Sequence, residues 1–142
     1  MEVIIVKKKL VFIFIFLLLI SIFYFRNIVY ALISGTEKVD KNMLNSMLQG
    51  RLRPTKSFSM VIDKKSYDIP LPKGSGLVST NKYIIPAGAL KKYKENIRKT
   101  EWSHLEQNGT SISMTNSSGK TVNITISSYT GAYLIIKYYC MD

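Results

Sequence analysis

Residues 110–140 read TSISMTNSSGKTVNITISSYTGAYLIIKYYC and carry the clearest structural signal in this chain. Polar and apolar residues alternate over residues 110–115 and again over residues 121–127, which is the pattern of half-buried strands. Asn116-Ser-Ser-Gly119 lies between them and has the composition of a turn. Residues 132–140 are apolar on both faces, as in a central or helix-covered strand. This stretch therefore predicts a three-stranded antiparallel meander.

The same alternation predicts which side chains of the meander face the core. The polar residues between the apolar ones, Asn123 among them, are expected to point outward. The inward set is Ile112, Met114, Val122, Ile124 and Ile126.

Two short helices are predicted before the meander. The first covers residues 40–50, with Asp40 as N-cap and Gly50 just past its C-terminal end. Its apolar stripe is expected to pack in the core rather than to form a binding groove, and consists of Met43, Leu44, Met47 and Leu48. The second covers residues 86–99, with Pro86 in its first turn. Its inward face is expected to comprise Leu90, Tyr93 and Ile97, with Trp102 as a further candidate.

The segment between the two helices is predicted to hold strands on either side of a long loop. Residues 57–62 alternate as a strand, and residues 83–85 form a second, short one. Residues 63–82 contain two Pro and two Gly residues and are expected to be irregular. Long loops of this kind often carry function, but a well-packed surface loop is the preferred interpretation. The fold class that follows is α+β, with one or two helices packed on an antiparallel sheet that ends in a three-stranded meander.

An apolar run over residues 10–25, without a charge and with one mildly polar residue, Ser21, precedes this domain. As a helix it would be about 24 Å long, and apolar character resumes up to Ile33 if Arg26 snorkels to the lipid headgroups. We therefore expect residues 10–33 to form a transmembrane signal anchor. Because basic residues before a span stay inside, Lys7 to Lys9 predict that residues 1–9 are cytoplasmic. Residues 34–142 would then form an extracytoplasmic α+β domain of a single-pass cell-membrane protein.

A cleaved signal peptide is the alternative interpretation of the same run. Val29-Tyr30-Ala31 loosely fits the small-residue rule for a cleavage site, which would release the domain after Ala31. However, the apolar run exceeds the usual 7–15 residues of such a signal, and Arg26 close to the cleavage site is unusual. The uncleaved anchor is therefore preferred.

The chain of 142 residues has a formal net charge of +11. Of its 20 Lys and Arg residues 16 lie in residues 34–142, against 8 of its 9 Asp and Glu residues, so the external domain carries a charge of about +8. This length and composition exclude a wholly disordered chain, a multi-span transporter and a large two-domain enzyme. A basic domain held at a membrane is attracted to anionic lipid or an anionic cell-wall polymer; nothing in the sequence specifically indicates nucleic acid.

Residues able to carry catalysis or to bind a metal are scarce. His104 is the single His, and Glu101 and Glu106 lie near it, but a solvated His is the preferred interpretation over a weak metal site. Cys140 is the single Cys, which excludes an intrachain disulfide; we expect it to be buried in the sheet. Tyr133, Tyr138 and Tyr139 could stack on a ligand, but packing is again preferred.

We therefore predict no catalytic, cofactor-binding or metal-binding residues and no enzymatic activity. The expected function is that of a membrane-anchored envelope protein whose basic external domain binds another protein or an anionic envelope polymer. Two alternatives remain: a secreted effector or inhibitor released by cleavage near Ala31, and a small hydrolase that uses His104 with Cys140 or a Ser.

Overall fold

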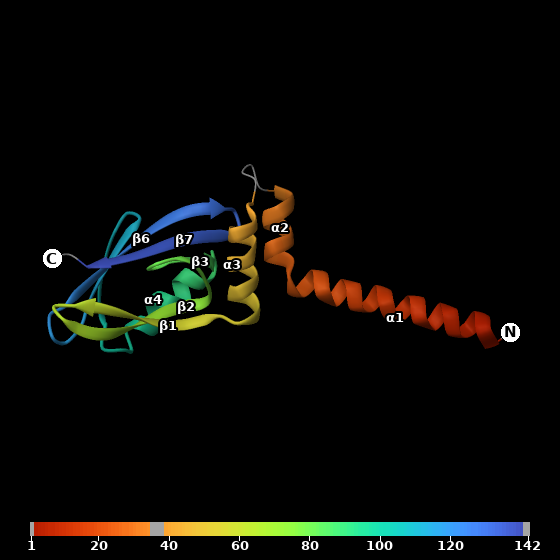
Figure 1. Cartoon of the computed structure of the whole chain (residues 1–142), viewed down its shortest axis with the longest axis horizontal. Coiled ribbons are helices and arrows are strands. Elements are labelled where there is room, and N and C mark those ends of the chain that lie inside the picture. Colours follow the sequence, from red (N-terminus) through yellow and green to blue (C-terminus); the bar gives the residue numbers. More distant parts are fainter. Residues whose placement is uncertain (1, 35–38, 141–142) are drawn as a thin grey trace.

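The computed structural model describes residues 2–34 and 39–140, with side chains described over residues 10–33 and 39–140. This part of the chain contains four helices and a seven-stranded sheet, which confirms the α+β class (Figure 1). The elements are α1 (Glu2–Tyr24), α2 (Arg26–Ser34), α3 (Lys41–Leu52), β1 (Thr55–Ile62), β2 (Lys65–Ser79), β3 (Lys82–Pro86), α4 (Ala89–Ile97), β4 (His104–Asn108), β5 (Ser111–Thr115), β6 (Thr121–Thr130) and β7 (Tyr133–Cys140).

The sheet is antiparallel throughout, in the order β1-β2-β3-β7-β6-β5-β4. The predicted meander is confirmed as β5, β6 and β7, and β7 is a central strand, as its two apolar faces indicated. Strand β4 was not predicted; it extends the meander to four strands at the sheet edge. Its sequence, His-Leu-Glu-Gln-Asn, holds one apolar residue, so it lacks the alternation that identifies a half-buried strand.

The expectation of an irregular segment over residues 63–82 is wrong, because most of it forms the long strand β2. The start of β2 pairs with β1 and its end pairs with β3. Its Pro and Gly residues lie between residues 70 and 76, near the point where β2 stops pairing with β1 and begins to pair with β3. Thr55 pairs with Ser75 and Ser57 with Pro70, so residues 71–74 bulge out of the ladder. Prolines are tolerated in a strand at such places, where no backbone donor is required.

The main core is formed by side chains of the sheet and of α4. The Phe58 ring of β1 lies 5.1 Å from the Tyr138 ring of β7, although β2 and β3 separate these strands in the sheet, so the sheet curls around this core. Tyr93 and Ile97 of α4 are buried here, as predicted, and Trp102 is fully buried after the helix. The inward positions of the meander are confirmed, with Ile126 only half-buried; the buried ones are Ile112, Met114, Val122 and Ile124.

Both predicted helices exist, but two of their boundaries are corrected. Pro86 is the last residue of β3, and α4 begins only at Ala89. Gly50 does not end α3, which continues to Leu52; instead, it lies where α3 contacts the backbone of β2. A side chain at Gly50 or at Gly76 would collide with the backbone of the opposite element. These glycines therefore permit close approach of helix and strand.

A second, smaller core joins α2 and α3 to the other face of the sheet. Ile28 and Ala31 of α2 are buried there with Met47 of α3, Ile84 of β3 and Tyr133 of β7. The predicted stripe of α3 is confirmed as core packing, because Met47 is fully buried and its other members are half-buried around it. The α2 segment is thus packed as part of the folded domain.

The continuous helix expected over residues 10–33 is not observed. The helix breaks after Tyr24, and the two parts meet at an angle of 77°. Among the described residues no single helix has the length and apolar character of a membrane span, although the bent pair Leu10–Tyr24 and Arg26–Ile33 has both. In Figure 1, α1 projects away from the domain, whereas α2 and α3 lie side by side across its base. The break allows α2 to turn and bury Ile28 and Ala31 against α3.

Candidate functional site

A cavity of about 530 Å³ opens where the N-terminal helices meet the domain. Its walls come from the α1–α2 corner, the end of α3, the β2 bulge, the end of β3 and one side of α4. Its volume lies within the range of about 300–1,000 Å³ that is common for small-molecule sites. Segments far apart in the sequence form this cavity, which makes it a product of the tertiary fold.

The wall of the cavity is rich in proline. All four prolines of the chain line it, two of them from β2: Pro54, Pro70, Pro72 and Pro86. Proline has no backbone N–H, so these positions present apolar rings and no donors. Gly74 continues the wall with a φ of 85°, and the buried Ser75 hydroxyl donates to the Pro72 carbonyl at 2.7 Å, which helps to hold the bulge in shape.

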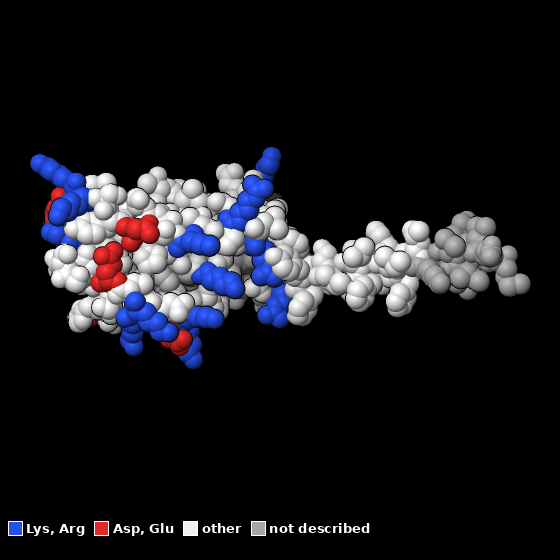
Figure 2. All heavy atoms as spheres, turned by 90° about the horizontal axis from the view of Figure 1, so that it is seen from below, with Lys and Arg blue, Asp and Glu red and all other residues white. Residues whose placement is uncertain are grey.

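Four basic side chains surround this apolar wall: Arg26, Arg51, Lys73 and Lys92. Among the described residues that line the cavity there is no Asp or Glu. In Figure 2, Lys and Arg residues are spread along the whole domain; the acidic residues in view lie among those farther from the N-terminal helix, whereas the basic residues next to the helix have no acidic residue beside them. The cavity is therefore a positively charged, mainly apolar site.

The two arginines are placed by aromatic rings of α1. The Arg51 guanidinium carbon lies 3.9 Å from the centre of the Tyr24 ring, and that of Arg26 lies 5.7 Å from the centre of the Phe23 ring. A guanidinium over a ring face gains a cation–π attraction and keeps its N–H groups available at the edges. Both arginines can thus present donors at the cavity mouth.

Two buried tyrosines, Tyr93 and Tyr133, line the cavity, and the hydroxyl of Tyr93 already donates a hydrogen bond within the domain. The Tyr93 hydroxyl donates to the Pro70 carbonyl at 3.0 Å and lies 3.2 Å from the Tyr138 hydroxyl. Burial raises the pKa of Tyr93 well above its usual range and also raises the pKa of Tyr133, which the positive charge of Arg51 partly offsets. Both tyrosines therefore stay neutral near pH 7. The arrangement can bind an anionic molecule with an apolar part.

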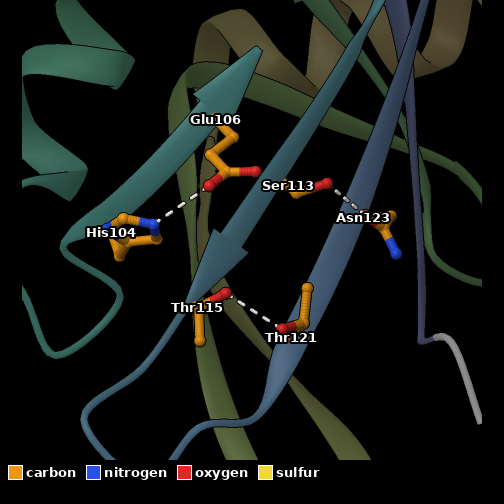
Figure 3. A network of polar contacts seen from close by, with 6 residues as sticks. All are labelled: His104, Glu106, Ser113, Thr115, Thr121 and Asn123. Carbon is orange, nitrogen blue, oxygen red and sulfur yellow. Dashed lines mark hydrogen bonds and ion pairs between the residues drawn. The ribbon is translucent and has the colours of Figure 1, made fainter. Parts of the chain in front are cut away.

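The predicted chemistry-bearing residues lie elsewhere. His104 and Glu106 are on the outer face of β4, with side chains 71% and 76% exposed and 3.2 Å between Nε2 and Oε1 (Figure 3). The described residues contain no group of three His, Cys, Asp or Glu side chains that could hold a metal ion. A solvated His104 is the interpretation that this geometry supports.

The residues of the hydrolase alternative are not brought together. Cys140 pairs with Val122 on the core side of β7, and its Sγ lies 3.2 Å from the Met60 Sδ. His104 is paired with Thr115 on the opposite face, in β4, which is separated from β7 by the two strands β6 and β5. Cys140 was expected to be buried in the sheet, but it is only half-buried.

Asn123 corrects the predicted exposure of the meander's outer face. It lies on that face with Ser113, Thr115 and Thr121 (Figure 3), but only 4% of it is exposed. Its Oδ1 accepts from the Ser113 hydroxyl at 2.5 Å, while its Nδ2 has no partner in the described part of the chain.

Of the three tyrosines considered for stacking, Tyr138 is in the main core and Tyr133 in the second core, where it also lines the cavity.

Sequence reasoning missed the cavity residues Arg26, Arg51, Lys73 and Lys92, because lysines and arginines are spread along the whole sequence. One signal was available: the Pro and Gly cluster over residues 70–76. It was interpreted as a packed surface loop in preference to a functional one, but in the structure residues 70–74 form part of the cavity wall. No protein family matches the chain, and no match was found among curated proteins or among solved structures.

Proposed function

We propose that this chain is a single-pass membrane protein of the cell envelope whose basic external domain binds an anionic envelope component and performs no catalysis. Residues 1–9 would lie in the cytoplasm, the apolar helix would cross the membrane, and residues 34–142 would lie outside. The exposure of α1 supports this anchor: Phe12 and Phe23, for example, are each 74% exposed. An apolar helix of this kind is unfavourable in water and favourable in lipid.

The break after Tyr24 shortens the proposed membrane span. Leu10–Tyr24 is about 22 Å long at 1.5 Å per residue, whereas the hydrocarbon core is ~30 Å thick. A difference of this size is accommodated by local thinning of the bilayer and by flanking residues that snorkel. The crosswise α2, with Leu32 51% and Ile33 81% exposed, suits a position in the membrane interface.

One observation carries the binding function: four basic residues surround a cavity whose wall includes the last turn of the apolar helix. If α1 crosses the membrane, this cavity lies at its outer surface. Anionic components of the envelope are then concentrated beside it, and the absence of acidic residues among its described lining residues favours them over cations. This charge pattern favours an anionic component over an ordinary protein partner.

The secreted alternative is less well supported. Ala31, at its cleavage site, is fully buried in α2, and Ile28 is 4% exposed. Cleavage after Ala31 would remove both side chains from the second core. Cleavage inside this packed helix would destabilise the released domain, because Met47 would lose the side chains of Ile28 and Ala31 that pack against it.

Localisation tests the anchor directly. Cells that express the chain with a C-terminal tag are fractionated, and intact cells are treated with external protease. We expect a full-length tagged protein in the membrane fraction that is trimmed from outside once the wall is removed. A shortened tagged form in the medium would instead establish secretion.

Charge variants test the binding function. Full-length protein in neutral detergent is applied to immobilised polyglycerol phosphate, an anionic polymer without acyl chains, over a series of salt concentrations. We expect salt-sensitive retention that falls several-fold in Arg51→Gln/Lys73→Gln, because each removed charge weakens the attraction. Arg53→Gln/Lys56→Gln is the control, since it removes the same number of charges from two exposed residues that do not line the cavity. An equal loss of retention in the control would show that retention depends only on the overall charge of the protein and not on the cavity.

A further inference from the structure

We infer that the cavity holds an acyl chain of an anionic phospholipid taken from the surrounding bilayer, with the lipid phosphate at Arg26 and Arg51. The inference rests on the proposed membrane anchor and names the ligand of the same site. It combines three properties of the cavity: its position, the chemistry of its wall and the orientation of its charges.

Position makes the cavity accessible from the bilayer. Phe23, Tyr24 and Phe25 at the end of the apolar helix form part of its wall, so one surface continues from the membrane span into the cavity. Aromatic and Arg residues at the end of a span lie at the level of the lipid headgroups. A lipid beside α1 could therefore place one chain in the cavity while its headgroup stays in the interface.

The chemistry of the wall favours a hydrocarbon over a sugar or a peptide. Pro70, Pro72 and Pro86 contribute rings without donors, and Leu71 and Ile97 add aliphatic side chains. The Tyr93 hydroxyl already donates to the Pro70 carbonyl, so it has no proton left for a ligand. Asn27, Asn96 and Thr100 also line the cavity, but the Thr100 hydroxyl already donates to the Ile97 carbonyl. A polymer rich in hydroxyl groups would therefore leave most of its polar groups unpaired against this wall.

The charges suit a phosphate diester. A guanidinium binds phosphate oxygens through two parallel N–H bonds, and the rings of Phe23 and Tyr24 hold the two arginines over the mouth of the cavity. Lys73, on the β2 bulge, and Lys92, on α4, add further positive charge around the site. Such a site discriminates anionic lipids from zwitterionic ones, whose net charge is zero.

Photo-crosslinking in vesicles tests the lipid directly. Full-length protein is reconstituted into phosphatidylcholine vesicles that contain a trace of phosphatidylglycerol with a photoreactive group at the end of one acyl chain. A parallel sample contains phosphatidylcholine that carries the same group. Any lipid at the span can label α1, so the informative products are those on the peptides that contain residues 69–76 and 89–97. We expect at least about fivefold more labelling of these peptides by the anionic probe.

Variants then assign the site. Arg51→Gln/Lys73→Gln is expected to lower labelling of the domain peptides by the anionic probe to the level of the neutral probe, whereas Arg53→Gln/Lys56→Gln, which removes two charges outside the cavity, leaves it unchanged. Gly88→Leu places a side chain on the cavity wall where a Cβ meets nothing within 4 Å, and it should lower labelling without removing a charge. Thermal unfolding of each variant shows that loss of labelling does not come from loss of the fold.

The outcomes separate this inference from the proposed function. Labelling confined to α1, or equal labelling of the domain by both probes, overturns the anionic lipid site. If binding to polyglycerol phosphate persists in that case, the proposed function stands with a polymer as its ligand. A chain found in the medium without its first 31 residues overturns both.

Discussion

The guanidinium carbon of Arg51, in the last turn of α3, lies 3.9 Å from the centre of the Tyr24 ring, in the last turn of α1. This contact joins the apolar N-terminal helix to the folded domain at the mouth of the basic cavity. The orientation of α1 therefore depends on a residue 27 positions later in the chain. The second core around Ile28 and Ala31 is the other contact that holds the corner.

We expect Arg51 and Tyr24 to be energetically coupled. In a double-mutant cycle of Arg51→Gln and Tyr24→Leu, the coupling in the free energy of unfolding should be about 0.5–1 kcal/mol, as for an exposed cation–π pair. Denaturant titration of the four full-length proteins in one detergent measures it. The same cycle with Arg53→Gln should give no coupling, and a zero value for Arg51 would mean that the stacked geometry is unimportant.

The contact between α3 and β2 should tolerate no side chain at Gly76. Gly76→Ala is expected to destabilise the domain by about 1–3 kcal/mol or more, because the new Cβ would collide with the Ser46 carbonyl. Urea denaturation measures the loss. Gly88→Ala is the matched control: nothing lies within 4 Å of its Cβ and its φ of −69° suits any residue, so it should be neutral or slightly stabilising.

If α2 belongs to the folded domain, its two faces must differ in their sensitivity to truncation. Ile28→Ala removes a side chain that is 4% exposed and should cost about 2–5 kcal/mol, by loss of burial and creation of a cavity. Ile33→Ala changes the same residue type where it is 81% exposed, and should cost almost nothing in detergent. Similar effects of the two changes on the unfolding midpoint would contradict the packing of α2 on α3.

High pH is expected to destabilise the domain. Burial raises the pKa of Tyr138 and of Tyr93 above the usual tyrosine value of about 10. Above that pH the unfolded chain releases these protons while the folded chain retains them, so the free energy of unfolding falls as the pH rises. Melting temperatures between pH 9 and about pH 11.5 should show this decline.

Removal of a titrating hydroxyl tests the cause of the alkaline effect. Tyr138→Phe should lower stability at pH 7 by about 1 kcal/mol, because its contact with the Tyr93 hydroxyl is lost. The same variant should show a shallower decline above pH 10. A decline of unchanged slope would assign the alkaline sensitivity to other groups.

Periodicity predicted the elements whose burial alternates. The strands over residues 57–62 and 121–127 were found because polar and apolar residues alternate along them, although Asn123 on the polar face of β6 is buried. Tyr93 and Ile97 were assigned to the core because apolar residues recur at helical spacing in α4. The strand β4 was missed, since an edge strand with exposed side chains has no such pattern. Strand β2 was taken for a loop because its prolines and glycines, which usually interrupt strands, here form a bulge between two partners.

Composition and local pattern were enough to predict an apolar N-terminal helix, a basic domain and an α+β fold, because these follow from hydropathy, charge and the burial of neighbouring side chains along one element. The break after Tyr24, the role of Gly50 and the cavity depended on contacts between distant segments. Arg51, Pro70 and Lys92 become one site only when α3, β2 and α4 converge on the same corner. No local pattern encodes that convergence, since it results from how the helices and the sheet pack together.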